Sequence, residues 1–337
     1  MRPRLTFFCE LEKAELVSLF ASGKLLDDLK ELGAGISLGL LDLSPERASV
    51  VRRLNQAGIP TIAWLLLPKE QGYWFNLDNA PQAVARYQAF RTWTAEEGLR
   101  WEGVGLDIEP DIRLMEALFR RQFAMIPRLS SRALRTMRLR QGKKIYWQLA
   151  EQIRADGYRL ESYQFPLILD ERLAHSSVLQ RLTGIVDIPA EREVFMLYTS
   201  LLRPNGLGAL WSYGPEIKAV ALGITGGGVD LGGWNRPPLN WDELARDLCH
   251  AWRWSDTLYI FSLEGCLRQG FLEQLQNFDW DRPIMEPVTS LRRVDAWRAT
   301  LQSSLWLVNN LAVIVLSGLA AALLLVPLWR YWRSTRR

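Results

Sequence analysis

The stretch that decides the fold is Trp101–Pro110, WEGVGLDIEP, a short apolar segment that ends in two acidic residues. Side chains alternate between the two faces of a strand, so Asp107 and Glu109 point to one face while Leu106 and Ile108 point to the other. Two carboxyl groups are costly to bury unless they have a use. At the carboxyl end of a parallel strand, such a pair occupies the position where barrel enzymes assemble their active sites. We therefore interpret the stretch as a catalytic strand.

The alternation of a short apolar strand with a helical segment or loop recurs eight times along the chain. Eight such units predict a parallel sheet that closes on itself. The 337 residues have room for one such barrel plus an appendage. The sequence therefore predicts an α/β fold, a (β/α)8 TIM barrel, over residues 1–280. The predicted strands are Leu5–Glu10, Ile36–Leu43, Pro60–Leu67, Gly103–Glu109, Tyr158–Phe165, Val194–Ser200, Ala219–Thr225 and Leu258–Leu263.

Local capping signals support this division of the chain. Ser44, followed by Pro45 and Glu46, combines a capping residue, a proline suited to the first helical turn and an acid near the positive end of the helix dipole. Gly58 is expected to end that helix, and Gly98 to end the helix before the catalytic strand.

The carboxyl end differs in composition from the barrel. No charged residue occurs between Arg298 and Arg330, and Leu311–Trp329 is an almost unbroken apolar run of about the length that a bilayer core requires. We predict a linker over residues 281–304, one transmembrane helix over 305–329 and a basic tail over 330–337.

The orientation of this helix follows from two opposed observations. Slightly more positive charges follow the apolar run than precede it, which alone favours a barrel outside the cell. No secretory signal precedes the barrel, however, and the apolar helix emerges last. We therefore expect a single-pass membrane protein, anchored at its carboxyl end in membrane lipid, whose barrel faces the cytoplasm. The scattered cysteines Cys9, Cys249 and Cys266 are compatible with a reducing compartment.

The positive charge is distributed unevenly. The formal net charge is +4, and Arg113–Lys144 carries ten Lys or Arg residues against one acid, Glu116. Such a segment could rest on anionic lipid, and a solvated helical face is the alternative interpretation. We expect no nucleic-acid partner.

Two motifs carry a resemblance to a known family. Residues 102–109 are similar to the DGxDxDxE signature of glycoside hydrolase family 18, the chitinases and endo-β-N-acetylglucosaminidases. The resemblance implies that Glu109 is the general acid and that Asp107 orients the acetamido group of the substrate. Residues 196–199, MLYT, resemble the MxYD motif of the same family, whose tyrosine matches Tyr198.

The chain departs from the family at two positions. Gly105 and Thr199 stand where the family has aspartates that help to tune the acetamido mechanism. The resemblance therefore supports the barrel fold and the general acid more strongly than it supports the family's substrate.

The chemistry of the pair supports the same assignment. Cleavage of a glycosidic bond needs an acid to protonate the leaving oxygen and a group that stabilises the positive centre. Asp107 would raise the pKa of Glu109 by like-charge repulsion and keep it protonated. An acetamido oxygen of the substrate could act as nucleophile, and otherwise a second carboxylate must serve. Candidates for that carboxylate, each with a cap or salt bridge as the alternative role, are Glu264, Glu161, Glu10 and Asp42.

Residues near the ends of other strands are candidates for binding the substrate. Flat sugar faces stack on aromatic rings, although each ring could equally be packing. Glycines 226–228 could bind phosphate, or could simply permit a tight turn. The predicted substrate-binding residues are Trp64, Trp74, Tyr163, Gln164, Trp211 and Glu264.

Other enzyme classes fit less well. With His175 and His250 as the two histidines, histidine-rich metal sites are disfavoured, and phosphate-loop motifs are absent from the sequence. Glu10 and Glu12 could join Asp107 and Glu109 around a divalent cation, but we expect neither a metal nor a cofactor.

The sequence thus predicts a membrane-anchored glycoside hydrolase that acts on a glycan or glycoconjugate, with Glu109 as acid. A barrel that binds a glycan or glycolipid without cleaving it, like a lectin, is the alternative, because two supporting acids are missing. Retention of Glu109 argues for the hydrolase.

Overall fold

The computed structural model describes residues 2–119, 132, 136–228 and 237–334. Its side chains are described over the same ranges except 118, 119 and 312–334. The predicted basic segment Arg113–Lys144 lies partly outside these residues.

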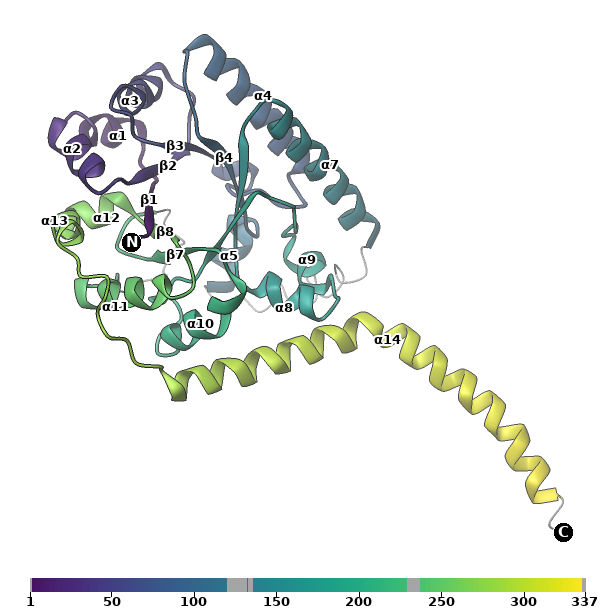
Figure 1. The fold of residues 1–337 in the computed structure, drawn as a ribbon. Helices are drawn as coiled ribbons and strands as arrows, with labels where there is room; N and C mark the ends of the chain where they lie inside the picture. Colours follow the sequence, from purple (N-terminus) through teal and green to yellow (C-terminus); the bar gives the residue numbers. More distant parts are fainter. Residues whose placement is uncertain (1, 120–131, 133–135, 229–236, 335–337) are drawn as a thin grey trace.

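Eight parallel strands close into a barrel in which each strand pairs with its neighbours in the sequence and β8 pairs with β1 (Figure 1). Every predicted strand is present, so the predicted (β/α)8 architecture is confirmed. The strands are β1 (Arg4–Cys9), β2 (Gly35–Leu40), β3 (Thr61–Leu65), β4 (Gly103–Ile108), β5 (Arg159–Gln164), β6 (Arg192–Met196), β7 (Ala219–Gly223) and β8 (Thr257–Phe261).

Helices surround the barrel and begin where the capping chemistry predicts. The hydroxyl of Ser44 accepts a hydrogen bond from the backbone N–H of Arg47 at 3.3 Å, and Pro45 opens the helix. Asn240 and Glu243 form a reciprocal capping box. The described helices of four or more residues are α1 (Lys13–Leu19), α2 (Gly23–Glu31), α3 (Pro45–Gln56), α4 (Ala80–Glu96), α5 (Ile112–Phe119), α7 (Thr136–Ala155), α8 (Leu167–Leu173), α9 (Val178–Thr183), α10 (Gly206–Tyr213), α11 (Trp241–Trp252), α12 (Leu263–Arg268), α13 (Phe271–Gln276) and α14 (Val288–Ser334).

The inner and outer faces of the strands bury different side chains. Leu106 and Ile108 of β4 face outward into the main core beneath the helices. A second cluster fills the barrel interior with aromatic and small side chains, among them Phe8, Trp64 and Tyr163. These side chains pack the interior below the mouth, and a cavity lies at the carboxyl ends of the strands.

The predicted linker 281–304 is wrong over most of its length, because α14 begins at Val288 and packs along α10 and α8 (Figure 1). Arg298 fixes it there. Its guanidinium donates to Asp170 at 2.8 Å and to Glu216 at 2.6 Å, and lies 3.8 Å from the ring centre of Tyr213. The first turns of α14 are therefore part of the barrel domain.

Loss of Arg298 should destabilise the barrel strongly. Asp170 is fully buried, so Arg298→Ala leaves an uncompensated buried charge, and the free energy of unfolding should fall by about 3–5 kcal/mol. Arg292→Ala, an exposed arginine on the same helix, is the matched control and should change stability by less than about 0.5 kcal/mol. Chemical denaturation measures both, and equal losses would contradict this role.

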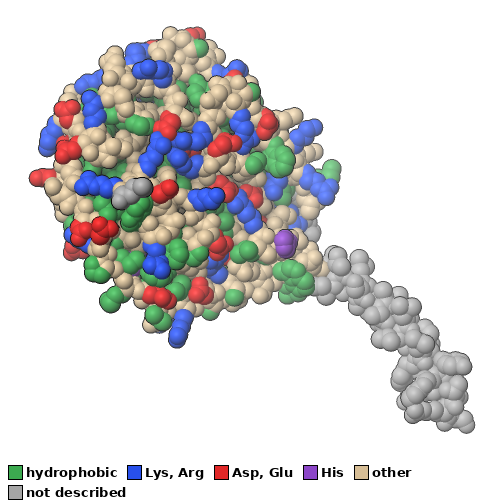
Figure 2. All heavy atoms as spheres, viewed as in Figure 1, with side chains coloured by type: hydrophobic (Ala, Val, Ile, Leu, Met, Phe, Trp, Pro, Cys, Tyr) green, Lys and Arg blue, Asp and Glu red, His purple; other side chains and the backbone are tan. Residues whose placement is uncertain are grey.

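Within the part of the chain whose side chains are described, no helix combines the length and apolarity needed to cross a membrane. The predicted transmembrane segment 305–329 lies mostly beyond Leu311, outside that part. Over the barrel, Figure 2 shows basic and acidic side chains interspersed on one face of the molecule.

Candidate active site

The acidic pair of β4 lies where the side-chain period predicts. Asp107 is 2% exposed and Glu109 is 8% exposed, and both line a cavity of about 160 Å³ at the mouth of the barrel. Tyr198, which follows β6, lines the same cavity. The predicted convergence of these three side chains on the inner face is therefore confirmed.

The acidic pair is buried, and the two carboxylate oxygens of Asp107 differ in their hydrogen bonding. The indole N–H of Trp64 donates to Oδ2 of Asp107 at 3.1 Å. No donor group among the described residues reaches the buried Oδ1. Interaction between the two carboxyl groups lowers the pKa of Asp107 and raises that of Glu109.

The pKa values follow from this environment. Burial raises the pKa of Asp107 to about 7. Burial, followed by the charge of Asp107, raises the pKa of Glu109 well above its usual range. The pair therefore holds a proton to higher pH than two solvent-exposed carboxyl groups would. A buried carboxyl group that stays protonated is what a general acid requires.

The buried pair should make the protein less stable as pH rises. Above about pH 4 an unfolded chain releases both protons, whereas the folded protein keeps them up to its raised pKa values. The native state then binds more protons, so the free energy of unfolding falls with increasing pH. It should fall by at least about 1.4 kcal/mol, the equivalent of one pKa unit, between about pH 5 and pH 8. The Asp107→Asn/Glu109→Gln double variant should lack this loss, and an identical pH dependence of denaturation would contradict the assignment.

Tyr198 lies close enough to Asp107 and Glu109 for their charges to affect its pKa. Burial is the main cause that raises the pKa of its phenol, and the charges of Glu109 and Asp107 come next. Its ring lies 5.6 Å from that of Phe261. The phenol stays protonated and can donate a hydrogen bond to a ligand in the cavity.

Three of the predicted substrate-binding aromatics lie at this site. Trp64, Trp74 and Tyr163 line the cavity together with the acidic pair. The sequence analysis missed Phe8 and Phe261, which also line it and pair in register across β1 and β8. Both occupy inward positions near strand ends, so the period of two along their strands could have found them.

Two predicted binding residues lie elsewhere. Gln164 follows the inward-facing Tyr163, so its side chain points to the opposite face, where its amide donates to Ser162 at 2.8 Å. Trp211 lies on α10, and its indole donates to Nδ1 of His250 at 2.7 Å. Burial lowers the pKa of His250 to about 4, which keeps this nitrogen an acceptor. Both side chains are bonded to protein groups, and neither lines the cavity that holds the acidic pair.

The candidate second carboxylates separate into two groups. Asp42 pairs with the buried Arg47 at 3.0 Å, and its pKa falls to about 2. Glu161 pairs with Arg192 at 2.9 Å deep in the barrel. Both are engaged in ion pairs with arginines, while Glu10 and Glu264 line the same open cavity at the mouth as Asp42.

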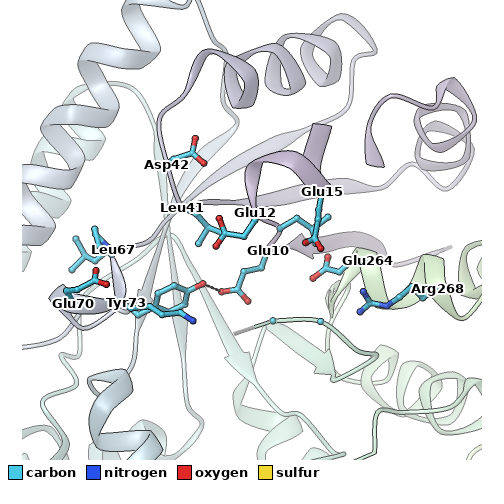
Figure 3. Close-up of a pocket in the computed structure, with 15 residues that line it drawn as sticks. Glu10, Glu12, Glu15, Leu41, Asp42, Leu67, Glu70, Tyr73, Glu264 and Arg268 are labelled. Atoms are coloured by element: carbon cyan, nitrogen blue, oxygen red, sulfur yellow. Dashed lines mark hydrogen bonds between the residues drawn. The ribbon is translucent and has the colours of Figure 1, made fainter. Parts of the chain in front are cut away.

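Glu10 and Glu264 belong to a wider acidic cavity of about 430 Å³ (Figure 3). Glu10 accepts a hydrogen bond from the hydroxyl of Tyr73 and lines both cavities. Glu264 is 3% exposed, and neither of its oxygens has a hydrogen-bond partner in the described part of the chain. The described carboxylates that line the wider cavity are Glu10, Glu12, Glu15, Asp42, Glu70 and Glu264, against Lys69 and Arg268.

The glycine triplet 226–228 has a conformational explanation. All three residues have positive φ, and a Cβ on Gly227 would lie 2.5 Å from Oε1 of Glu264. The triplet therefore lets the backbone turn closely past the acidic cavity, as the tight-turn interpretation predicts. The surrounding carboxylates disfavour phosphate. No group of acids, histidines or cysteines with the arrangement of a metal site occurs among the described residues.

The structure shows what surrounds Gly105 and Thr199, the two positions at which the chain departs from the family-18 pattern. A Cβ on Gly105 would lie 2.6 Å from the ring of Tyr163, which occupies the space of the missing aspartate. Thr199 hydrogen-bonds to Asp247 of α11, so it lies outside the cavity. An aromatic ring thus stands beside Asp107 where the family has another acid.

Solved structures similar to this chain are barrels of enzymes that act on sugars. The glycoside hydrolase domain of PgaB (BpsB) from Bordetella bronchiseptica has 10% sequence identity and a TM-score of 0.51, over 84% of this chain and all of that domain. D-allulose 3-epimerase from Methylomonas sp. has 10% identity and a TM-score of 0.42, over 88% of this chain and 98% of that one. The mannanase catalytic domain from Streptomyces sp. SirexAA-E has 16% identity and a TM-score of 0.36, over 77% and 74%.

No protein-family model matches the chain, and no curated protein matches it in sequence. At these identities the structural likeness shows the fold alone. The chain is therefore a TIM barrel with a buried acidic pair at its mouth, and the predicted membership of family 18 is not confirmed.

Proposed function

We propose that the protein is a glycoside hydrolase in which Glu109 is the general acid and Asp107 its assistant. The observation that carries the proposal is the buried pair itself, which lines an aromatic cavity large enough for part of a sugar and in which burial raises the pKa of Glu109. The fold shared with glycoside hydrolase barrels supports it, as does the resemblance of β4 to the family-18 signature.

In the proposed reaction, Glu109 gives its proton to the glycosidic oxygen as the bond from that oxygen to C1 breaks. The carbonyl oxygen of a 2-acetamido group attacks C1 and forms a cyclic oxazolinium ion, while Asp107 accepts a hydrogen bond from the acetamide N–H. The Glu109 carboxylate then takes a proton from water, whose hydroxyl adds to C1. The products are a reducing sugar of retained configuration and the alcohol of the leaving group.

Trp64 and Tyr198 would position the reacting groups. The hydrogen bond from Trp64 fixes Asp107. The phenol of Tyr198 is a neutral donor close to the pair and can hold the acetamide oxygen before it attacks. Neither residue exchanges a proton in this scheme.

The charge of the mouth restricts the substrate. Carboxylates dominate the acidic cavity, which adjoins the acidic pair through Glu10, Gly227 and Gly228. A uronic acid or sialic acid would be repelled there. We therefore propose a neutral or amino sugar.

A panel of 4-methylumbelliferyl glycosides tests the proposal on the full chain. The N-acetyl-β-glucosaminide should be cleaved faster than the β-glucoside by at least about tenfold, because the second lacks the internal nucleophile. The glucuronide should not be cleaved. Binding of N-acetylglucosamine oligomers without turnover of any glycoside would instead support the lectin-like alternative.

We further propose that residues 305–329 anchor the protein in a membrane with the barrel on the cytoplasmic side. The apolar run in the sequence supports the anchor. Protease added to intact cells should leave the barrel uncut, and protease added to inverted vesicles should digest it. Digestion in intact cells would reverse the proposed topology.

A further inference from the structure

A third cavity, of about 510 Å³, lies between the mouth of the barrel and the first turns of α14. We call it the apolar groove. Apart from Asn205 and Arg293, the residues that line it are hydrophobic or aromatic. They include Leu167, Leu202, Ala209, Tyr213, Val294 and Trp297.

The apolar groove adjoins the catalytic cavity. Phe165, Met196, Tyr198 and Leu201 line both. A molecule whose sugar lies against the acidic pair would enter the groove at these shared side chains. This direction differs from that of the acidic cavity, which meets the catalytic cavity at Glu10, Gly227 and Gly228.

Two large hydrophobic side chains along the groove are exposed to solvent. Leu202 is 43% exposed and Trp297 is 50% exposed. Apolar surface gains about 25 cal/mol for each Å² removed from water, so a flexible hydrocarbon chain would be held here. The volume also falls within the range of about 300–1,000 Å³ typical of ligand sites.

The position of the groove beside α14 indicates that such a hydrocarbon chain would come from a membrane lipid. One wall is α14, which continues from Trp297 past the barrel as far as Ser334 (Figure 1). Its sequence has no charged residue between Arg298 and Arg330. A helix that leads from the groove into an apolar segment would place the groove beside a lipid surface.

We propose that the apolar groove binds the hydrocarbon chain of a glycolipid while the sugar occupies the catalytic cavity. This inference rests on the proposed function and specifies its substrate class. Glu109 protonates the oxygen between C1 and the lipid, that bond breaks, and water supplies the new hydroxyl on C1. The lipid leaves as its alcohol.

Photolabelling tests chain binding separately from hydrolysis. The full chain in its native membrane is irradiated with dodecanol that carries a diazirine, and labelled peptides are mapped by mass spectrometry. Labels should fall on residues 201–209 and 293–297, and excess dodecanol should suppress them. Trp297→Glu should reduce this labelling at least about fivefold, because it places a charge in the groove.

Trp306→Glu is the matched control, since Trp306 lies on the same helix, is 51% exposed and does not line the groove. It should leave labelling of residues 201–209 unchanged. Equal labelling of these residues in both variants, or labels confined to other segments, would overturn the inference even if soluble glycosides are cleaved. Chain binding without cleavage of any glycoside would overturn the proposed hydrolase and retain the groove as a lipid site.

Discussion

Glu109→Gln should lower kcat for methylumbelliferyl N-acetyl-β-glucosaminide by about 10³-fold, within the 10²–10⁴-fold range of general acid catalysis. The amide has the shape of the carboxyl group but has no acidic proton to give. The same variant should retain kcat/KM within about tenfold on the 2,4-dinitrophenyl glycoside, because this leaving group needs no protonation and kcat/KM reports only the steps up to its departure, before the water is activated. This difference between leaving groups separates a lost acid from a damaged fold.

Glu12→Gln provides the control for this experiment. Glu12 is an exposed carboxylate on the rim of the acidic cavity, and its replacement should leave both rates within about twofold. Thermal unfolding of each variant checks that the barrel is intact. A Glu109→Gln variant that cleaves the methylumbelliferyl glycoside at the wild-type rate would remove Glu109 from the mechanism.

Asp107→Asn should shift the alkaline limb of the pH–rate profile to lower pH. The negative charge of Asp107 helps to raise the pKa of Glu109, so its removal lets Glu109 lose its proton at a lower pH. We expect a shift of at least about one unit and a fall in kcat of about 10²-fold, because the acetamide N–H also loses its charged acceptor.

Glu70→Gln serves as the control for the electrostatic effect, since Glu70 is exposed and lines only the outer acidic cavity. Its profile should match that of the wild type. If the alkaline limb of Asp107→Asn also stays in place, then Asp107 does not set the pKa of the catalytic acid.

The sequence is sufficient to predict the barrel and the location of the acidic pair. Both depend on patterns that are visible in the sequence. These are the eight repeated strand–helix units and the alternation of inward and outward side chains along β4. The same alternation places Gln164 on the outer face once Tyr163 is taken as inward-facing. Phe8 and Phe261 could have been found by the same rule.

Other features depend on contacts between distant segments. Trp211 lies on a helix, where sequence alone does not show that its indole meets His250. The ring of Tyr163 fills the space beside Gly105, although it comes from the next strand. The helical start of α14 at Val288 is stabilised by the contact of Arg298 with Asp170, a residue more than a hundred positions away.

The measurement that tests the central claim most directly is hydrolysis in water enriched in ¹⁸O. Neutral glycolipids and N-acetylglucosamine oligomers are incubated with the full chain, and the new reducing ends are analysed by mass spectrometry. The account predicts that the wild-type protein releases sugars with one ¹⁸O at C1, and that Glu109→Gln releases none above background. No labelled reducing end with the wild type, or equal release by the two proteins, would contradict the claim that the acidic pair of β4 cleaves glycosidic bonds.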